Sequence, residues 1–213
     1  MLLGNLQALL TEYYDLDLSC NIYDFLTTDG DLASALDAGG RDIDEKLLIA
    51  ERDGEADVAL YLCEELIGRL EENDPWLQLN DGNLADFWVA FEGVSHFIHF
   101  AWRASIDMPV SLLELELQAE VDKFIATAIL LRRQGRKLPD GLHRWLFDRS
   151  RLSDALSEIE IARYEQASYY AGKYCLKLEP ELARERLQPA LRNELRRFYR
   201  LARPAKIGHI ESR

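Results

Sequence analysis

Cysteine, long apolar runs and N-terminal positive charge are all scarce in this chain of 213 residues. The three cysteines, Cys20, Cys63 and Cys175, are widely spaced and form no Cys-x-x-Cys pair, which argues against a disulfide framework or a cysteine zinc site. No stretch approaches the roughly 20 uncharged apolar residues needed to span a bilayer. No Lys or Arg precedes the first apolar residues, unlike in a signal peptide. We therefore expect a cytoplasmic protein with no membrane span.

The common catalytic and repeat signatures are missing as well. No P-loop or Gly-x-Gly-x-x-Gly follows an expected strand, which argues against a nucleotide site. No Gly-x-Ser-x-Gly elbow is found, and no Ser, His and Asp set stands out. No internal repeat of roughly 30–45 residues indicates a helical solenoid. These absences leave the function to be argued from charge and helical pattern.

Positive charge is rare in the first half of the chain. Residues 1–100 contain 4 Lys and Arg against 22 Asp and Glu, whereas residues 101–213 contain 21 against 16. The acidic half repels nucleic acid and the other half attracts it, but we favour the interpretation that the two halves neutralise each other within the fold. The length and the 48% apolar content predict a single domain over 1–213, with an acidic α+β part over 1–80 and a helical bundle over 81–205.

Helical periodicity is strongest between Leu84 and Gln134. Two long helices are predicted there, joined by a short turn at Ser105–Met108. The first is apolar nearly all round, which is typical of a helix in the middle of a bundle. Ser111 followed by Glu114 predicts a capping box at the start of the second helix.

Further elements surround this helical hairpin. Ser153 is the expected N-cap of a third long helix over Ala155–Leu176. Pro180 is expected to open a basic helical region that bends or restarts at Pro189, with fraying beyond Ala205. The segments 46–51 and 57–62, which flank an Asp-Gly turn, predict a β-hairpin.

The predicted fold is therefore mainly α. It is a bundle of six to eight helices built around a central antiparallel helix hairpin, with a small β-hairpin in the N-terminal part. The hairpin 84–134 and the third long helix are expected to form its core.

Polar residues form narrow stripes on the two central helices. The first helix carries Glu92, His96, His99 and Arg103, and the second carries Glu116, Glu120, Lys123 and Thr127. Another set on the second helix is expected to be an ordinary solvent edge: Glu114, Gln118, Asp122, Arg132 and Arg133. In an antiparallel pair, His96 should lie near Gln118–Glu120, His99 near Leu115 and Glu116, Glu92 near Lys123 and Arg103 near Ser111.

The facing stripes allow two interpretations. A site would use Glu92, His96, His99, Glu116 and Glu120 as ligands of zinc, iron or manganese. Without a metal ion, a carboxylate and an imidazole suit general acid–base catalysis. The alternative is a buried charge network that fixes helix packing. We favour this alternative, because neither His-Glu-x-x-His nor a pair of Glu-x-x-His motifs is present.

Two functional hypotheses follow. The first is a non-enzymatic, adaptor-like regulatory protein that binds a protein partner through its acidic N-terminal part or through Arg192, Arg196, Arg197 and Arg200. RNA binding by these arginines is less favoured, and a homodimer is a further expectation. The second hypothesis is a metal-dependent or acid–base enzyme with its site between the central helices. It requires an open cavity beside the stripes.

Overall fold

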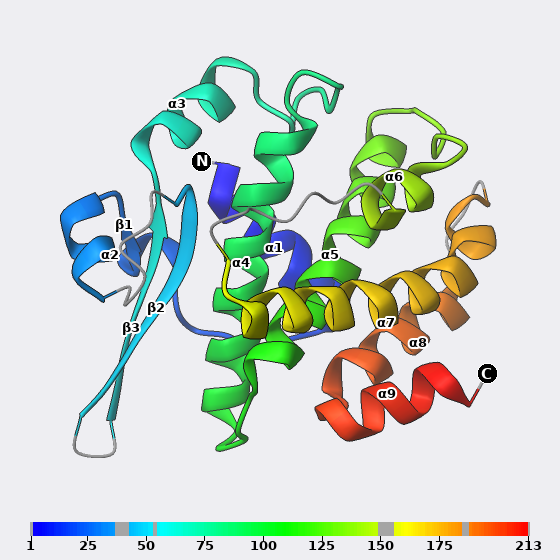
Figure 1. The fold of residues 1–213 in the computed structure, drawn as a ribbon. Coiled ribbons are helices and arrows are strands. Elements are labelled where there is room, and N and C mark those ends of the chain that lie inside the picture. Colours follow the sequence, from blue (N-terminus) through cyan, green and yellow to red (C-terminus); the bar gives the residue numbers. More distant parts are fainter. Residues whose placement is uncertain (1, 37–42, 53–54, 149–155, 185–187, 213) are drawn as a thin grey trace.

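A computed structural model describes residues 2–36, 43–52, 55–148, 156–184 and 188–212 (Figure 1). The fold is mainly helical, as predicted. The helices in the described ranges are α1 (Leu2–Tyr14), the 3-10 helix η1 (Ile22–Asp24), α2 (Gly30–Leu36), α3 (Glu64–Glu72), α4 (Leu84–Ser105), α5 (Leu112–Arg133), α6 (Leu142–Asp148), α7 (Glu158–Leu182), α8 (Pro189–Arg200) and α9 (Arg203–Glu211). The strands are β1 (Leu26–Thr27), β2 (Glu45–Arg52) and β3 (Glu55–Leu62).

The core is centred on α5, which packs against both α4 and α7. This confirms the predicted helical hairpin and its partnership with the third long helix. Ser111 caps α5, since its hydroxyl accepts a hydrogen bond from the backbone N–H of Glu114. Nearly every residue of α5 from Glu114 to Leu131 is buried, because elements from both ends of the chain surround this helix.

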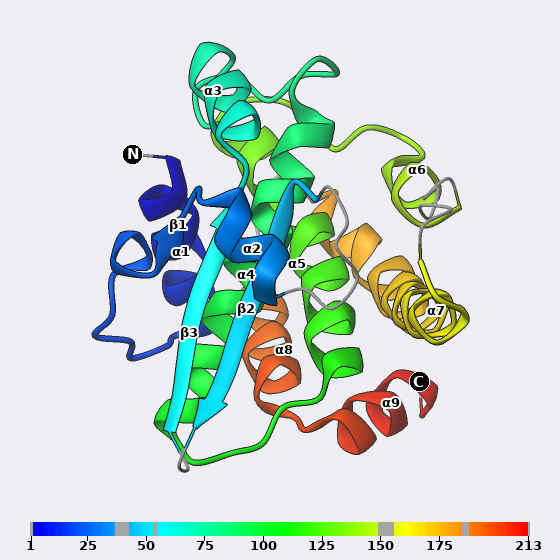
Figure 2. The same ribbon diagram turned by 60° about the vertical axis from the view of Figure 1, so that its left-hand side comes forward.

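A three-stranded sheet lies beside α4, with the strand order β1-β3-β2. The antiparallel β2–β3 pair is the predicted hairpin, and β1 adds a short parallel strand to β3 that the sequence did not predict. Figure 2 shows α2 over one face of the sheet and α4 behind the other. The residues of β2 are thereby brought next to the polar side of α4.

The third long helix begins later than predicted. Ser153 lies outside the described residues, and Ser157 caps α7 through a complete capping box with Glu160. Pro180 does not open a new helix, because α7 continues through it and ends at Leu182. The prediction assumed that Pro180 stops one helix and opens the next, but Pro180 lies within the last turn of α7.

The end of the chain is ordered more extensively than predicted. The region after Pro189 forms α8 and α9, and α9 includes the residues that were expected to fray. Lys206 and Ile210 are fully buried, so tertiary packing holds α9 against the bundle. The separate α9 brings the α-helices in the described ranges to nine rather than six to eight.

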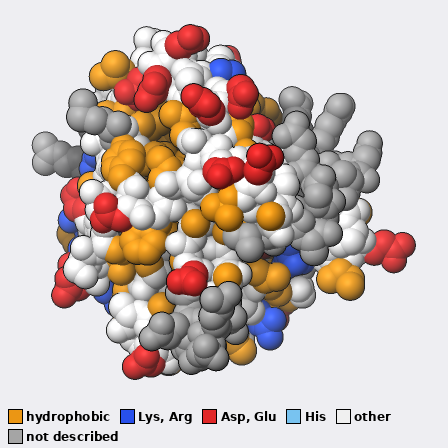
Figure 3. Space-filling view, turned by 90° about the vertical axis from the view of Figure 1, so that its left-hand side faces the viewer, with side chains coloured by type: hydrophobic (Ala, Val, Ile, Leu, Met, Phe, Trp, Pro, Cys, Tyr) orange, Lys and Arg blue, Asp and Glu red, His pale blue; other side chains and the backbone are white. Residues whose placement is uncertain are grey.

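The face that carries α2 and the sheet is acidic and patched with apolar groups. Figure 3 shows Asp and Glu side chains spread between hydrophobic patches on this face, with few Lys or Arg. This agrees with the acidic composition of the first half of the chain. Among the described residues, no helix is both long and apolar enough to cross a membrane.

Candidate functional site

The predicted contact between Glu92 and Lys123 forms across α4 and α5. The ammonium Nζ of Lys123 donates to Glu92 Oε2 at 2.7 Å and to Glu120 Oε1 at 2.6 Å. One turn further along, the indole N–H of Trp88 donates to the hydroxyl of Thr127 at 2.9 Å. The two polar stripes therefore face each other over this part of the hairpin, as the antiparallel arrangement predicted.

His96 lies between two glutamates from different elements. Its Nε2 atom is 3.4 Å from Glu116 Oε2, and its Nδ1 atom is 3.7 Å from Glu45 Oε1. Burial acts to lower the pKa of His96, but Glu116 and Glu45 outweigh it and raise this pKa well above its usual value. The predicted partner of His96 was Gln118–Glu120, so the contact with Glu116 lies closer to the start of α5.

Glu45 is the residue of this site that the sequence analysis missed. It lies on β2, far from the central helices in the sequence, and it approaches α4 at Gly93. Together Glu45, Glu92 and His96 could hold a metal ion, because one ligand atom from each lies within 4.8 Å of the others. Gly93 was the available signal, since a glycine inside an apolar helix often marks a close approach by a neighbouring segment.

Acidic groups outnumber basic groups in this part of the interior. We define the polar layer as Glu45, Glu92, His96, Glu116, Glu120, Lys123 and Arg163. Arg163 enters from α7, and its Nε atom is 3.6 Å from Glu116 Oε1. The raised pKa favours a protonated His96, with which the four carboxylates exceed the three cations by one charge. A neutral His96, as in a metal ligand, leaves an excess of two negative charges. Buried charge of one sign is unfavourable unless a counter-ion balances it.

The carboxylates of the polar layer differ in their electrostatic surroundings. Burial raises the pKa of Glu45 against the effect of His96, and it raises the pKa of Glu120 against the effect of Lys123. Burial also acts to raise the pKa of Glu92, but Lys123 and His96 outweigh it and hold this pKa below its usual value. Glu92 is therefore the best-compensated anion of the three.

A cavity of about 410 Å³ opens directly onto the polar layer. Its wall includes Glu45, His96, Glu116, Arg163 and Tyr164. Three buried atoms of this wall make no hydrogen bond among the described residues: Oε1 of Glu45, Nε2 of His96 and Nε of Arg163. A cavity with unsatisfied polar groups at its wall is typical of a ligand site.

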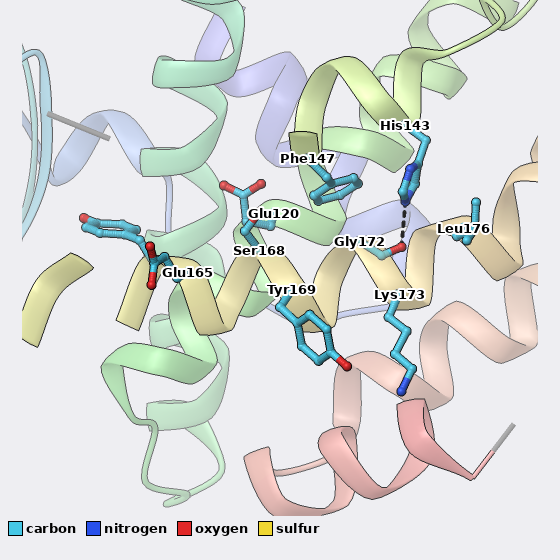
Figure 4. A pocket seen from close by; sticks show the side chains of 10 residues that line it. Glu120, His143, Phe147, Glu165, Ser168, Tyr169, Gly172, Lys173 and Leu176 are labelled. Atoms are coloured by element: carbon cyan, nitrogen blue, oxygen red, sulfur yellow. Dashed lines mark hydrogen bonds between the residues drawn. The ribbon is translucent and has the colours of Figure 1, made fainter. Parts of the chain in front are cut away.

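A second cavity, of about 530 Å³, shares Tyr164 with the first and lies along α6 and α7 (Figure 4). Glu120 of the polar layer reaches its wall from α5, and Glu165, Tyr169 and Lys173 line it from α7. The dashed line in Figure 4 is the 2.7 Å contact between His143 Nε2 and the carbonyl oxygen of Gly172. The polar layer is therefore bordered by cavities at Glu45 and at Glu120.

His99 and Arg103 belong to a separate, deeper cluster. Glu114 Oε1 is 3.2 Å from His99 Nε2 and 3.3 Å from an Arg103 amino group. Arg103 also donates to the carbonyl oxygen of Pro109 at 3.0 Å. His99 was expected next to Glu116 and among the metal ligands, but it lies outside the group formed by Glu45, Glu92 and His96.

The predicted solvent edge of α5 is wrong for its first three members. Glu114, Gln118 and Asp122 are all almost completely buried, because α1, α8 and α9 cover this edge. Asp122 accepts hydrogen bonds from Tyr14, from Ser95 at 2.6 Å and from Gln118 at 2.7 Å. The buried ammonium group of Lys206 donates to the side-chain oxygen of Gln118. Only Arg132 and Arg133, at the end of α5, remain partly exposed or exposed.

Burial dominates the titration of this cluster. It raises the pKa of Asp122 to about 6, although hydrogen bonds from Ser95, Tyr14 and Gln118 oppose it. Burial and the positive charge of Lys206 lower the pKa of His99 to about 3. The Glu114 carboxylate is directed into this cluster, and only the Ser111 half of the predicted capping box forms.

The C-terminal arginines bind the end of α1. Arg200 donates to the carbonyl oxygens of Tyr14 and Asp15 at 2.9 and 2.8 Å, and Arg196 donates to that of Tyr13 at 3.1 Å. α1 ends at Tyr14, and Asp15 follows in the left-handed conformation, which leaves carbonyl groups without helical partners.

The remaining two predicted partner-binding arginines are placed differently. Arg192 and Arg197 are both exposed, and Arg192 lies over the Tyr13 ring. The basic helix therefore docks on the acidic half of the chain at α1. One of these arginines, Arg196, also pairs with a carboxylate, Asp15, at 3.5 Å, and neutralisation between the two halves as a whole stays a prediction.

Comparison of the chain with family models, with curated proteins and with solved structures finds no match. The function is accordingly argued from the geometry and charge of the site.

Proposed function

We propose that this protein binds a divalent metal ion through Glu45, Glu92 and His96, and that it is a metal-dependent enzyme acting on a small molecule in the adjoining cavity. The observation that carries the proposal is the convergence of three ligand atoms within 4.8 Å, two of them from residues that line a 410 Å³ cavity, Glu45 and His96. Two carboxylates and an imidazole suit zinc, iron or manganese.

The charge and burial of the ligands support this proposal. A divalent ion balances the excess of two negative charges that the polar layer carries with neutral His96. His96 is only 8% exposed, and its Nδ1 atom faces Glu45 Oε1 at 3.7 Å. Tetrahedral ligands of zinc are about 3.4 Å apart, so ligand atoms that lie up to 4.8 Å apart have to approach one another by up to about 1.4 Å around the ion.

Three protein ligands leave a coordination position for water or substrate, as in catalytic rather than structural zinc sites. A bound ion supplies Lewis acidity or an activated water molecule. Glu116 contacts His96 and lines the cavity, so it is the nearest further carboxylate to act as a general base. Lys123 holds Glu92 in place, and Arg163 holds Glu116.

The interaction-protein hypothesis has less support than this enzyme proposal. Arg196 and Arg200 bind backbone carbonyl oxygens at the end of α1, so part of the hydrogen-bonding capacity of the predicted basic surface is used within the fold, although Arg192, Arg197 and Arg200 remain exposed. Partner binding by the acidic face stays a prediction.

The test is metal content of the untagged protein by mass spectrometry, with titration of the metal-free protein by zinc, manganese and iron(II). We expect one ion per chain, and affinity losses of at least about tenfold in His96→Asn and Glu45→Gln. Glu165→Gln is the matched control, because Glu165 lines the second cavity. The proposal is wrong if folded wild-type protein binds no ion stoichiometrically, or if the site variants bind as well as the control.

A further inference from the structure

We infer that the cavity beside Glu45 and His96 binds an uncharged aliphatic carbonyl compound, such as an ester or an amide. The carbonyl group lies at the polar layer and the aliphatic chain lies along the outer wall. The placement of the ligand's carbonyl group rests on the proposed metal site. The placement of its aliphatic tail rests on a separate set of residues at the outer wall.

The outer wall of the cavity carries a group of aliphatic side chains beside the charged residues Lys46 and Glu160. Branched side chains from β2, from α5 and from the residues that precede β2 and α7 meet there: Ile43, Leu47, Ile49, Leu112, Leu115 and Leu156. Leu112 is 57% exposed and Ile49 is 38% exposed, although both are large apolar residues. Contact with an apolar chain removes this surface from water, so the wall favours an aliphatic ligand.

The polar end of the cavity offers a hydrogen-bond donor. The Nε–H group of Arg163 is buried and makes no hydrogen bond among the described residues, because its nearest ion-pair partner, Glu116 Oε1, lies 3.6 Å away. The guanidinium group lies over the Tyr164 ring, 5.3 Å from the ring centroid. A ligand carbonyl oxygen at the cavity wall can approach this N–H more closely than Glu116 does and accept a hydrogen bond from it.

The charge of the polar layer selects an uncharged head group. With a divalent ion and neutral His96, four carboxylates are balanced by the ion, Lys123 and Arg163. A ligand carboxylate then adds an unbalanced buried negative charge, and an ammonium group adds a positive charge beside the metal ion. An ester or amide carbonyl adds neither, and it can still contact the ion and Arg163.

Three probe molecules separate the contributions that the alkyl tail and the charge of the head group make to binding. Octanamide has both the aliphatic chain and the neutral carbonyl, octanoate has the same chain with a charge, and acetamide has the same head without the chain. Binding is measured by calorimetry on metal-free and zinc-loaded protein. We expect octanamide to bind one molecule per chain, with octanoate and acetamide at least about tenfold weaker.

Two variants of cavity residues test whether octanamide binds in this cavity. Leu112→Asn removes an apolar contact with the alkyl tail of octanamide, and Arg163→Met removes the hydrogen-bond donor for its carbonyl oxygen. Each variant should weaken octanamide binding by about fivefold or more. Leu176→Asn is the control, because Leu176 is a similarly exposed leucine of the second cavity. Equal binding of octanoate or acetamide, or unchanged binding in both cavity variants, overturns the inference.

The two proposals fail separately. Octanamide binding that depends on Leu112 and Arg163 but occurs without any metal affinity supports this inference and overturns the proposed metal function. Stoichiometric metal binding without octanamide binding does the reverse.

Discussion

Gly93 on α4 lies so close to Glu45 on β2 that a Cβ atom at position 93 would stand 2.7 Å from Glu45 Cγ. The same atom would stand 2.8 Å from a methyl carbon of Leu60 on β3. The missing side chain therefore lets the sheet approach α4 and places Glu45 beside His96. The approach of the sheet and the construction of the candidate site depend on the same glycine.

We predict that Gly93→Ala destabilises the protein and weakens metal binding together. Overpacking against Glu45 and Leu60 costs about 1–3 kcal/mol, which outweighs the gain of up to about 1 kcal/mol from replacing glycine in a helix. Urea unfolding and zinc titration measure the two effects. Gly68→Ala on α3 is the control, because an added Cβ there meets nothing within 4 Å, and it should stabilise the fold. A Gly93→Ala protein with increased stability and unchanged zinc affinity would contradict the prediction.

The second prediction concerns the cation of the polar layer. Lys123→Met keeps the length of the side chain but leaves Glu92 and Glu120 without their common partner. We expect a loss of about 3–5 kcal/mol in the free energy of unfolding, because unpaired buried charge is strongly unfavourable. Unfolding by urea at neutral pH is the measurement.

A double variant tests the cause of this loss. Glu92→Gln in the Lys123→Met background removes one of the orphaned charges, so part of the stability should return. A single variant as stable as wild type, or a double variant that loses the sum of both single effects, would mean that the ion pair contributes little.

The central hairpin could be predicted because its signals are local. Helical periodicity and the Ser111 cap defined α4 and α5, and the antiparallel connection correctly brought Glu92 to Lys123. Glu45 could not be found this way, because its distance to His96 depends on how the sheet docks against α4. Periodicity describes one helix face and contains no information about a distant strand.

The buried edge of α5 was predicted wrongly for a related reason, because its burial depends on distant segments of the sequence. The spacing of Glu114, Gln118 and Asp122 is typical of a solvated helix face and predicted a solvent-exposed edge. α9 supplies Lys206 to this edge, from the segment that was expected to fray. Composition cannot tell a solvated polar stripe from one that is satisfied by another polar element.

The third prediction tests the docking of α8 on α1. Arg200→Gln removes two hydrogen bonds to the carbonyl oxygens that end α1. We expect a loss of about 1 kcal/mol, because the bonds are charge-assisted but partly exposed to water. Thermal and urea unfolding measure it. Arg197→Gln, one turn away on the exposed side of α8, should stay within about 0.5 kcal/mol of wild type. Equal effects of the two variants would show that the contacts to α1 contribute nothing specific.

The last prediction uses the fully buried His99, whose pKa is lowered to about 3 from an ordinary value of 6.5. Between these pH values the unfolded chain binds a proton that folded His99 does not bind. The stability contributed by neutral His99 is therefore complete above about pH 6.5 and is lost as the pH falls, by up to about 1.4 kcal/mol per pH unit. His99→Gln removes this titration, although it also costs the ring contact with Tyr199, 4.7 Å between centroids.

The measurement is the free energy of unfolding in urea at about pH 7.5 and about pH 5, compared between wild type and His99→Gln. Since Asp122 titrates in both proteins, its opposite contribution cancels in the comparison. We expect wild type to lose about 2 kcal/mol more than the variant over this interval. His143→Gln, at a half-buried histidine of α6, is the control and should follow wild type. Parallel losses in wild type and His99→Gln would mean that His99 is protonated in the folded protein and that Glu114 outweighs its burial.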